Sequence, residues 1–486
     1  MRIAVIGAGL VAGVLLAGCD AGREQTADVV AQSGEAPETV QLTVGPAVRI
    51  GTGTSPLDGD CGKLSDGYTY PDDTETDPRL AISPTDPARI AVAFMRDPVL
   101  AISAATSEDG GATWQEAEPP GLSPCTGTSY NSYGDQDLAA GIDDRLYLVA
   151  VQGDFTPEGQ PLVLGEEYWM NSAVTVSTSA DFGRTWSQPV IVSPLGEYQH
   201  TTLVATDPAR PGIAHVAWHV HRNPSQPEGT ESHLDDGAVY MASTLDGGAS
   251  WSEPETVMAA RGGLDLLQFD DGELLAVTLA GEDPATAAMV FSRRSEDGWG
   301  EPSPLPLQSN TSAFMHPENE MVLAIDMPVS LGPDGALHQV ASSYDPATNR
   351  GNVSVVTSRD RGASWSVPAT VADVEGPAWN AAIGAAPDGA LGVFWYDARD
   401  DVAGDGAITT RARFAVSLDG ESWTETALSE PFDLAQGPRP HVLLYLGNYF
   451  EVQPAGPGAF GVAFAVAPPL SVGAADLHYV NVAYRP

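Results

Sequence analysis

A short turn sequence recurs six times along this 486-residue chain and limits its fold more than any other feature. Four copies follow the pattern Ser/Thr-x-Asp-x-Gly-x-Ser/Thr-Trp, and two are degenerate; they begin at Ser107, Ser179, Thr244, Ser295, Ser358 and Ser417. In such a turn the Asp carboxylate accepts backbone N–H groups, Gly supplies a positive φ, and Trp fills the space between neighbouring sheets. We therefore interpret all six copies as structural turns without a chemical role.

A second pattern, an apolar strand followed by a Gly/Asp/Pro turn and another apolar strand, alternates with these turns. It occurs seven times, at Arg79–Phe94, Asp137–Val151, Thr201–Trp218, Leu264–Leu279, Met321–Val340, Asn380–Trp395 and Tyr449–Phe464. Each of the first six hairpins is followed by one turn copy, which gives a repeating unit of four strands. A single unit cannot bury both faces of its sheet, so the units must stack around an axis.

The sequence therefore predicts an all-β fold with a single β-propeller over residues 39–486. Seven blades are favoured over six, with the repeated turns on one rim. The seventh unit has no turn copy, but its tail, Leu477–Ala483, supplies one more strand. We expect Thr39–Ile50 to provide the missing outer strand, because closing the ring in this way leaves no free sheet edge.

The N-terminus is typical of an exported protein. Residues 1–18 contain one Arg and a long apolar run, as a secretory signal does. Leu16-Ala17-Gly18-Cys19 resembles the lipobox of bacterial lipoproteins, which implies lipidation of Cys19, a flexible tether over residues 19–38 and a place at the bacterial cell envelope. An ordinary signal peptide with a chance cysteine is the alternative.

The net charge argues against nucleic acid and anionic lipid as partners. With 65 acidic and 22 basic side chains, the chain carries a formal charge of −43, which repels nucleic acid and anionic lipid. We expect the protein to be a monomer and to contact a membrane only through its lipid anchor. The remaining cysteines, Cys61 and Cys125, form an even pair, which favours one disulfide in an exported protein over two free thiols.

The repeated turn resembles the Asp-box, or bacterial neuraminidase repeat, of the sialidase superfamily, over about residues 75–486. The resemblance implies a propeller whose ligand site lies on the face opposite the repeated turns. It also implies a sialidase-like exo-glycosidase acting on the terminal acidic sugars of glycans. Asp-box propellers also include non-catalytic binding proteins, so a propeller that binds glycan or protein is an alternative.

Ionisable residues, with one asparagine, gather where the first strand of each hairpin begins and the second ends. They are Asp77, Arg79, Arg96, Asp97, Asp135, Asp137, His200, His219, His221, Arg222, Glu318, Glu320, Tyr344, Asp345, Asp397, Arg399, Asp400, Asn448 and Tyr449. Such a concentration at one set of positions is typical of a ligand site, and acidic loops that merely keep the protein soluble are the alternative.

The family's catalytic groups are carried over one residue at a time. The resemblance implies that Tyr449 is the nucleophile, Glu320 its base and Asp97 the acid/base. Among the residues that would bind the substrate carboxylate, the resemblance points to Arg79 and Arg411, with Arg399 or Arg350 completing the triad. The match is imperfect, because Arg79 stands in Asp-Pro-Arg-Leu and Phe450 and Glu451 replace the small residues that follow the family's tyrosine.

Histidines form an alternative site. His200, His219 and His221, with Arg222, lie at the two ends of one predicted hairpin. They suggest a polysaccharide lyase with a His-centred site, or Zn²⁺ binding, with hydrogen-bonded structural histidines as the other reading. The acid pairs Asp135/Asp137 and Asp397/Asp400 leave Ca²⁺ binding open, but we assign no metal ligands and expect no cofactor to be required.

Overall fold

The computed structural model describes most of the chain after residue 39. The described residues are 40–51, 57, 74–97, 100–128, 130, 132–155, 169–193, 198–221, 237–260, 262–280, 288–310, 313–316, 321–323, 325–439, 444–469 and 473–486. Residues Thr39–Pro486 form one compact unit. Within the described ranges there are no α-helices, and only two 3₁₀ turns, Pro124–Thr126 and Leu434–Gln436, interrupt the strands.

The first four sheets follow one another along the chain, with each sheet's innermost strand first. They are β3 (Glu75–Ile82), β4 (Ile90–Arg96), β5 (Ala101–Ser107) and β6 (Gln115–Ala117); β7 (Ser132–Ala140), β8 (Leu146–Phe155), β9 (Trp169–Ser179) and β10 (Val190–Ile191); β11 (Tyr198–Thr206), β12 (Ala214–His221), β13 (Ala238–Thr244) and β14 (Glu255–Ala259); and β15 (Gly262–Gln268), β16 (Leu274–Ala280) and β17 (Ala288–Ser295) with β18 (Gly298–Trp299) and β19 (Ser303–Pro304). Every pairing within them is antiparallel.

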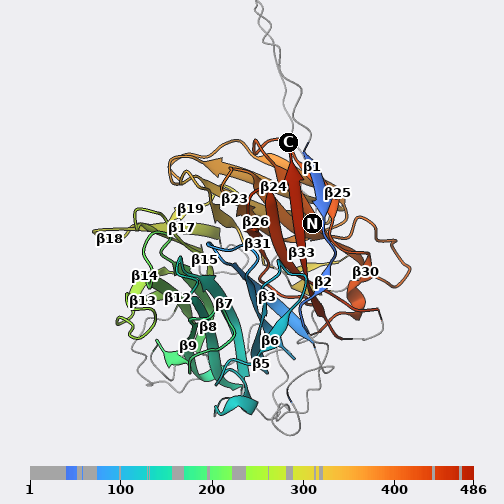
Figure 1. Cartoon of the computed structure of the whole chain (residues 1–486). Coiled ribbons are helices and arrows are strands. Elements are labelled where there is room, and N and C mark those ends of the chain that lie inside the picture. The colour runs from blue at the N-terminus through green and yellow to red at the C-terminus, as the bar shows by residue number, and fades with distance from the viewer. Residues whose placement is uncertain are drawn as a thin grey trace, which may run out of the picture. The chain divides into compact units, whose positions relative to one another are not determined.

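Three more sheets complete the set. They are β22 (Val329–Leu331), β23 (Leu337–Asp345), β24 (Arg350–Ser358) and β25 (Ala369–Glu375); β26 (Ala378–Ala385), β27 (Leu391–Asp397) and β28 (Thr409–Ser417) with β29 (Thr424–Ala427) and β30 (Phe432–Asp433); and β31 (Glu451–Pro454), β32 (Ala459–Val466) and β33 (Asp476–Arg485) with β1 (Gln41–Val44) and β2 (Val48–Arg49). Figure 1 shows the red strands of the last sheet beside the blue β1, and β1 pairs with β33.

The seven sheets are the blades of a closed propeller. Each innermost strand contacts the next, in the order β3, β7, β11, β15, β22, β26 and β31, and β31 contacts β3 again. The prediction of an all-β, seven-bladed propeller is confirmed. One hairpin differs from the prediction of Met321–Val340. Its first part, β21 (Met321–Leu323), pairs with β20 (Ala313–Met315) in a separate two-stranded sheet, and the fifth blade begins only at Val329.

The strands form because alternate side chains on each sheet pack against the blades on either side. β4, with the sequence Ile-Ala-Val-Ala-Phe-Met-Arg, is buried along its whole length, as expected for a strand covered on both faces. Six hydrophobic clusters fill the spaces between neighbouring blades and contain most of the buried aliphatic and aromatic side chains among the described residues.

The repeated turns join the third and fourth strands of the first six blades. In the first copy, Asp109 accepts the N–H and the hydroxyl of Thr113 at 2.8 and 2.7 Å, and Ser107 Oγ accepts the N–H of Gly111 at 2.9 Å. Trp114 packs edge-on against Tyr479 of the seventh blade, with ring centroids 5.6 Å apart. The turn therefore stabilises its own loop and also fastens neighbouring blades together.

The signal segment, the lipid anchor, the tether and the disulfide between Cys61 and Cys125 remain predictions. Residues 1–18, the tether and Cys19 lie outside the described residues. Cys125 is disulfide-bonded, but Cys61 also lies outside the described residues. No helix in the described part of the chain is long and apolar enough to cross a membrane.

Candidate functional site

The innermost strands share an unusual backbone feature at the end where they enter their blades. In β3, β7, β11, β15 and β26 the pairing with the second strand shifts at a bulge. Four bulge residues have a positive φ: Asp77 (54°), Asp135 (48°), Thr201 (49°) and Asn380 (53°). Non-glycine residues rarely adopt this conformation, and such strain concentrates at functional sites. Because all four residues lie on innermost strands, which surround the propeller axis, we expect the functional site to lie there.

A tyrosine and a carboxylate meet at this ring. Tyr449, in the segment before β31, donates its hydroxyl hydrogen bond to Asp135 Oδ1 at 3.3 Å. Burial and then the charge of Asp135 raise the pKa of Tyr449 well above 10. The phenol is therefore protonated at neutral pH, and Asp135 is in position to accept its proton.

His200 lies on the other oxygen of the same carboxylate. Its Nε2 is 3.5 Å from Asp135 Oδ2, and 43% of its side chain is exposed. The N–H of Thr201 donates to the same oxygen at 3.0 Å. These contacts fix the orientation of Asp135 between a buried phenol and a half-exposed imidazole.

Arg79 lies directly beneath Tyr449. Its guanidinium carbon is 4.3 Å from the centre of the Tyr449 ring, a cation–π contact. The guanidinium is 1% exposed and forms ion pairs with Glu451 at 3.0 Å and Asp137 at 3.3 Å. Both carboxylates also accept backbone N–H groups of the following blade, from Leu80 and Val204. Arg79 is therefore held at the junction of several blades and supports the tyrosine ring.

A cavity of about 300 Å³ lies along the axis, and Arg79, Asp137, Asp265 and Glu451 are among its lining residues. Burial, followed by the charge of Asp137, raises the pKa of Asp265 to about 8. Burial also raises the pKa of Glu451, to about 7, against the attraction of Arg79. The axis therefore resists additional negative charge, since its own carboxyls retain protons.

A second tyrosine–carboxylate pair lies beside the first. Asp77 accepts the hydroxyl of Tyr445 at 2.6 and 2.7 Å and the N–H of Asn448 at 2.7 Å. Burial raises the pKa of Asp77 although these hydrogen bonds lower it. This pair ties the segment that carries Tyr449 to the first blade, because Asp77 lies on β3.

Of the residues predicted for catalysis, the structure brings Tyr449 and Arg79 together. Asp97 lies at the end of β4, is 6% exposed and accepts the N–H of Thr74 at 2.9 Å. Glu320 and Arg222 lie outside the described residues, as does the side chain of His221. His219 is 1% exposed, and its Nε2 lies 2.9 Å from the carbonyl oxygen of Ala260, so it has a structural partner.

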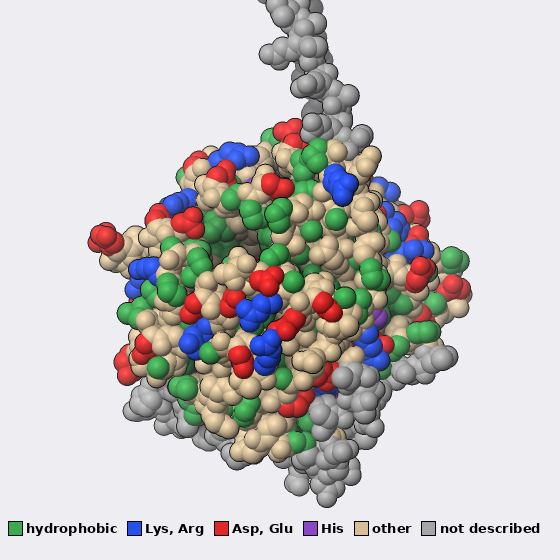
Figure 2. All heavy atoms as spheres, in the orientation of Figure 1, with side chains coloured by type: hydrophobic (Ala, Val, Ile, Leu, Met, Phe, Trp, Pro, Cys, Tyr) green, Lys and Arg blue, Asp and Glu red, His purple; other side chains and the backbone are tan. Residues whose placement is uncertain are grey.

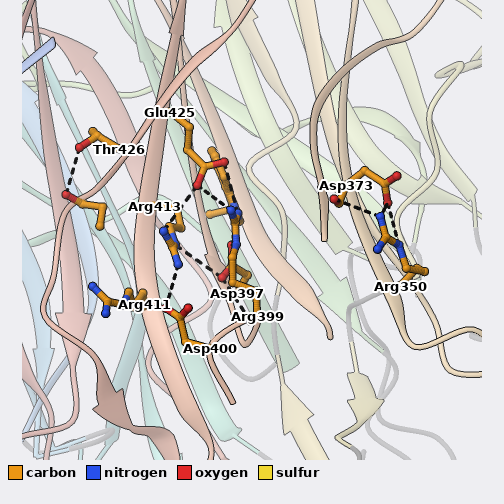
Figure 3. Close-up of polar contacts among 11 residues, drawn as sticks. Arg350, Asp373, Asp397, Arg399, Asp400, Arg411, Arg413, Glu425 and Thr426 are labelled. Carbon is orange, nitrogen blue, oxygen red and sulfur yellow. Dashed lines mark hydrogen bonds and ion pairs between the residues drawn. The ribbon is translucent and has the colours of Figure 1, made fainter. Parts of the chain in front are cut away.

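The other predicted carboxylate-binding arginines lie on outer parts of the fifth and sixth blades, in ion pairs (Figure 3). Arg399 pairs with Asp397 at 2.6 Å and Glu425 at 2.8 Å. Arg411 pairs with Asp400 at 2.7 Å, and Arg350 pairs with Asp373 at 2.6 Å. Arg350 and Arg411 are on third strands, whereas Arg79 is on an innermost strand. The described arginines therefore do not assemble an open triad around Arg79.

Arg411 instead borders a larger cavity, of about 930 Å³, between the sixth and seventh blades. Its walls include Phe432, Phe464 and His478. Within the described residues, no group of three or more His, Cys, Asp or Glu side chains is arranged to hold a metal ion. The two acid pairs that are candidates for Ca²⁺ binding have other partners. Asp135 and Asp137 accept hydrogen bonds from backbone N–H groups, and Asp397 and Asp400 form ion pairs with arginines.

Sequence reasoning did not identify Asp135 as the partner of Tyr449, nor Glu451 as the partner of Arg79. Asp135 follows β7's first residues as Asp77 follows those of β3, and this equivalence was the available signal. In the sequence, Glu451 stands out only as a departure from the family pattern. Its pairing with Arg79 joins residues 372 positions apart in the chain, which only ring closure brings together.

Neither a protein-family model nor a curated protein matches the sequence. Among solved structures, a protein of unknown function from Dyadobacter fermentans is 12% identical, with a TM-score of 0.47 over 91% of this chain and 99% of that chain. A polysaccharide lyase, described as an ulvan lyase bound to a glucuronic acid–rhamnose sulfate unit, is 13% identical, with a TM-score of 0.42 over 76% and 83%. A Hadza microbial sialidase is 14% identical, with a TM-score of 0.40 over 84% and 65%.

Proposed function

We propose that the protein is a glycoside hydrolase of sialidase-like design, with its reaction centre at Tyr449 and Asp135. The contact that carries the proposal is the hydrogen bond of 3.3 Å between the buried phenol and the carboxylate. Asp135 is itself one of the four residues on innermost strands that have a positive φ. The likeness to solved structures concerns the fold, so the proposal depends on these contacts and on the repeated turn.

In this proposal Tyr449 Oη attacks the anomeric carbon of a terminal sugar, and Asp135 accepts the phenolic proton as the new C–O bond forms. A neutral phenol needs this base, because the pKa of Tyr449 lies well above 10. The bond to the leaving oxygen breaks, and Asp97 remains the group predicted to protonate that oxygen. Water then attacks the anomeric carbon of the tyrosyl–sugar intermediate, and the deprotonated Asp97 accepts the proton of that water. The bond between the sugar and Tyr449 Oη breaks, and Asp135 returns its proton to the phenolate.

For Arg79 the proposed role differs from the carboxylate binding that the resemblance implied. Arg79 is buried under the ring, so we propose that it positions Tyr449 and does not bind the substrate. Its positive charge lowers the pKa of the phenol and so assists proton loss during attack. In this proposal Asp135 has the role of base that the resemblance implied for Glu320, which lies outside the described residues.

The test is hydrolysis of a panel of fluorogenic glycosides by the purified protein. Loss of a positioned base or nucleophile reduces turnover by about 10²-fold or more, so Tyr449→Phe and Asp135→Asn are each expected to show this loss. Tyr484→Phe is a matched control, because Tyr484 also donates to an aspartate, Asp388 at 2.8 Å, at the turn between β26 and β27. Full activity of Tyr449→Phe on a substrate that the wild type hydrolyses would refute the mechanism.

A second candidate is a polysaccharide lyase, which the half-exposed His200 beside Asp135 favours. An exposed imidazole next to a buried phenol is suited to remove one proton and supply another in an elimination. The measurement is the ultraviolet absorbance of an unsaturated product formed from uronate polymers, with His200→Gln as the variant. Turnover of neither substrate class would leave the binding propeller as the remaining alternative.

A further inference from the structure

The structure assigns a substrate class to the proposed site: we infer that the sugar unit held against Tyr449 and Asp135 is uncharged. The inference rests on the proposed function and departs from the acidic sugars that the resemblance implied. Its basis is the arrangement of charge around the axis, where each described basic group already has acidic partners.

Recognition of a sugar carboxylate requires an arginine with an open edge, since the strong pairing is bidentate. Arg79 presents no fully free edge: its Nη2 has no hydrogen-bond partner among the described residues, but each edge that contains Nη2 also contains a nitrogen that is already bonded. Its Nε is bonded to the carbonyl of Gln136 at 3.2 Å, its Nη1 to Glu451 at 3.0 Å, and the Tyr449 ring covers its face. With 1% of its surface exposed, it cannot bind a carboxylate bidentately without breaking one of these buried contacts.

The second line of evidence is the balance of charge at the axis. Asp137 and Glu451 pair with the guanidinium of Arg79, and Asp265 lines the same cavity. Two further carboxylates, Asp135 and Asp77, accept the hydroxyls of Tyr449 and Tyr445. Several of these carboxyls retain protons more strongly than they do in water, so a further anion is disfavoured.

Basic side chains away from the axis are also paired with acidic ones. On the face drawn in Figure 2, basic side chains lie next to acidic ones. Arg350, Arg399 and Arg411 each pair with a carboxylate (Figure 3). The formal charge of the whole chain is −43, so the long-range field also repels an anion.

The groups at the site suit hydroxyls. A carboxylate accepts hydrogen bonds and donates none, and a sugar hydroxyl is a donor. Asp135 is oriented by the N–H of Thr201, and the half-exposed imidazole of His200 lies beside it. An imidazole nitrogen can donate or accept a hydrogen bond, depending on its tautomer. A neutral sugar presents several hydroxyls to such acceptors without bringing a charge.

The experiment compares fluorogenic substrates that share one leaving group. The central pair is the β-glucoside and the β-glucuronide of 4-methylumbelliferone, which differ in a hydroxymethyl and a carboxylate group. The α-arabinofuranoside and the α-sialoside extend each class. We expect kcat/KM for the best neutral substrate to exceed that for the best acidic one by at least about tenfold. The gap should narrow between about 0.05 and 0.5 M NaCl, because salt screens the repulsion.

The outcomes separate this inference from the proposed function. Preference for the glucuronide or the sialoside would overturn the inference while leaving a Tyr449-dependent hydrolase in place. If no glycoside is hydrolysed, the hydrolase proposal fails, and the inference is then judged by binding of the intact protein to an array of neutral and acidic glycans. Retention on neutral glycans would support it, whereas retention on acidic glycans, or on none, would overturn it.

Discussion

Asp265 offers the most direct test of the electrostatics at the axis. Its side chain is partly exposed to the axial cavity, and burial raises its pKa from 3.8 to about 8. A carboxyl whose pKa is higher in the folded state binds a proton more tightly there than in the unfolded chain. The folded state is therefore penalised as the pH rises from about 4 towards 8, and the penalty is constant above that range.

The magnitude follows from the size of the shift. An increase from 3.8 to about 8 is about four units, and at about 1.4 kcal/mol per unit this gives an upper limit of about 6 kcal/mol. Water in the cavity reduces the penalty, so we expect Asp265→Asn to raise the free energy of unfolding by about 1–3 kcal/mol at pH 8.5. At pH 4 the two proteins should be equally stable, because the wild-type carboxyl is then neutral in the folded state.

The assay is thermal unfolding at a series of pH values. For a domain of this size, 1 kcal/mol corresponds to about 1 °C in Tm, so Asp265→Asn should gain about 1–3 °C at pH 8.5 and nothing at pH 4. Asp270→Asn is the matched control, since Asp270 is exposed in the turn that follows the same strand. Destabilisation by Asp265→Asn at pH 8.5, or an equal gain at both pH values, would show that the penalty of burying this carboxyl has been misjudged.

Three further predictions concern stability. Gly111→Ala should lower the free energy of unfolding in urea by about 1–3 kcal/mol more than the control Gly389→Ala. Both glycines have a φ of +88°, but a Cβ at position 111 would lie 2.3 Å from a tyrosine ring of the seventh blade. Equal losses of stability in the two variants would contradict this prediction. Tyr445→Phe should lower the free energy of unfolding by about 1–3 kcal/mol, since buried Asp77 loses a hydroxyl donor, and an unchanged unfolding midpoint would count against it. Hydrogen bonds from Ser250 lower the pKa of Asp246 to about 2, so the Tm advantage of the wild type over Asp246→Asn should be present above pH 4 and lost as the pH falls to 2; a gap that persists at pH 2 would exclude an ionic origin.

The fold was predictable because its determinants are local. The alternation of strand residues and the Asp-Gly-Trp turns each act within about ten positions, and a blade such as β3–β6 follows from them directly. The one shifted hairpin, at β20 and β21, lacked a competing local signal, since Met321 begins an apolar run just as Val329 does.

The site was less accessible to sequence reasoning because its contacts cross the ring. Tyr449 meets Asp135 from 314 positions away. Sequence position alone also gives no sign that an arginine is neutralised: Arg399 is close to Asp397 in the chain, but its pairing with Glu425 depends on the spacing of β27 and β29. The residue types at the axis were therefore predictable, whereas their pairings were not.

The junction of β1 and β33 has a consequence for how the chain is connected. Gln41 is paired with Arg485, so residues near the two ends of the propeller are neighbours across one antiparallel ladder. A short Gly-rich linker joining them would leave every blade intact, and new ends opened in an exposed turn, such as that at Gly389, would give a circular permutant. We therefore expect the same closed ring of blades to form when the blades occur in a different order along the chain.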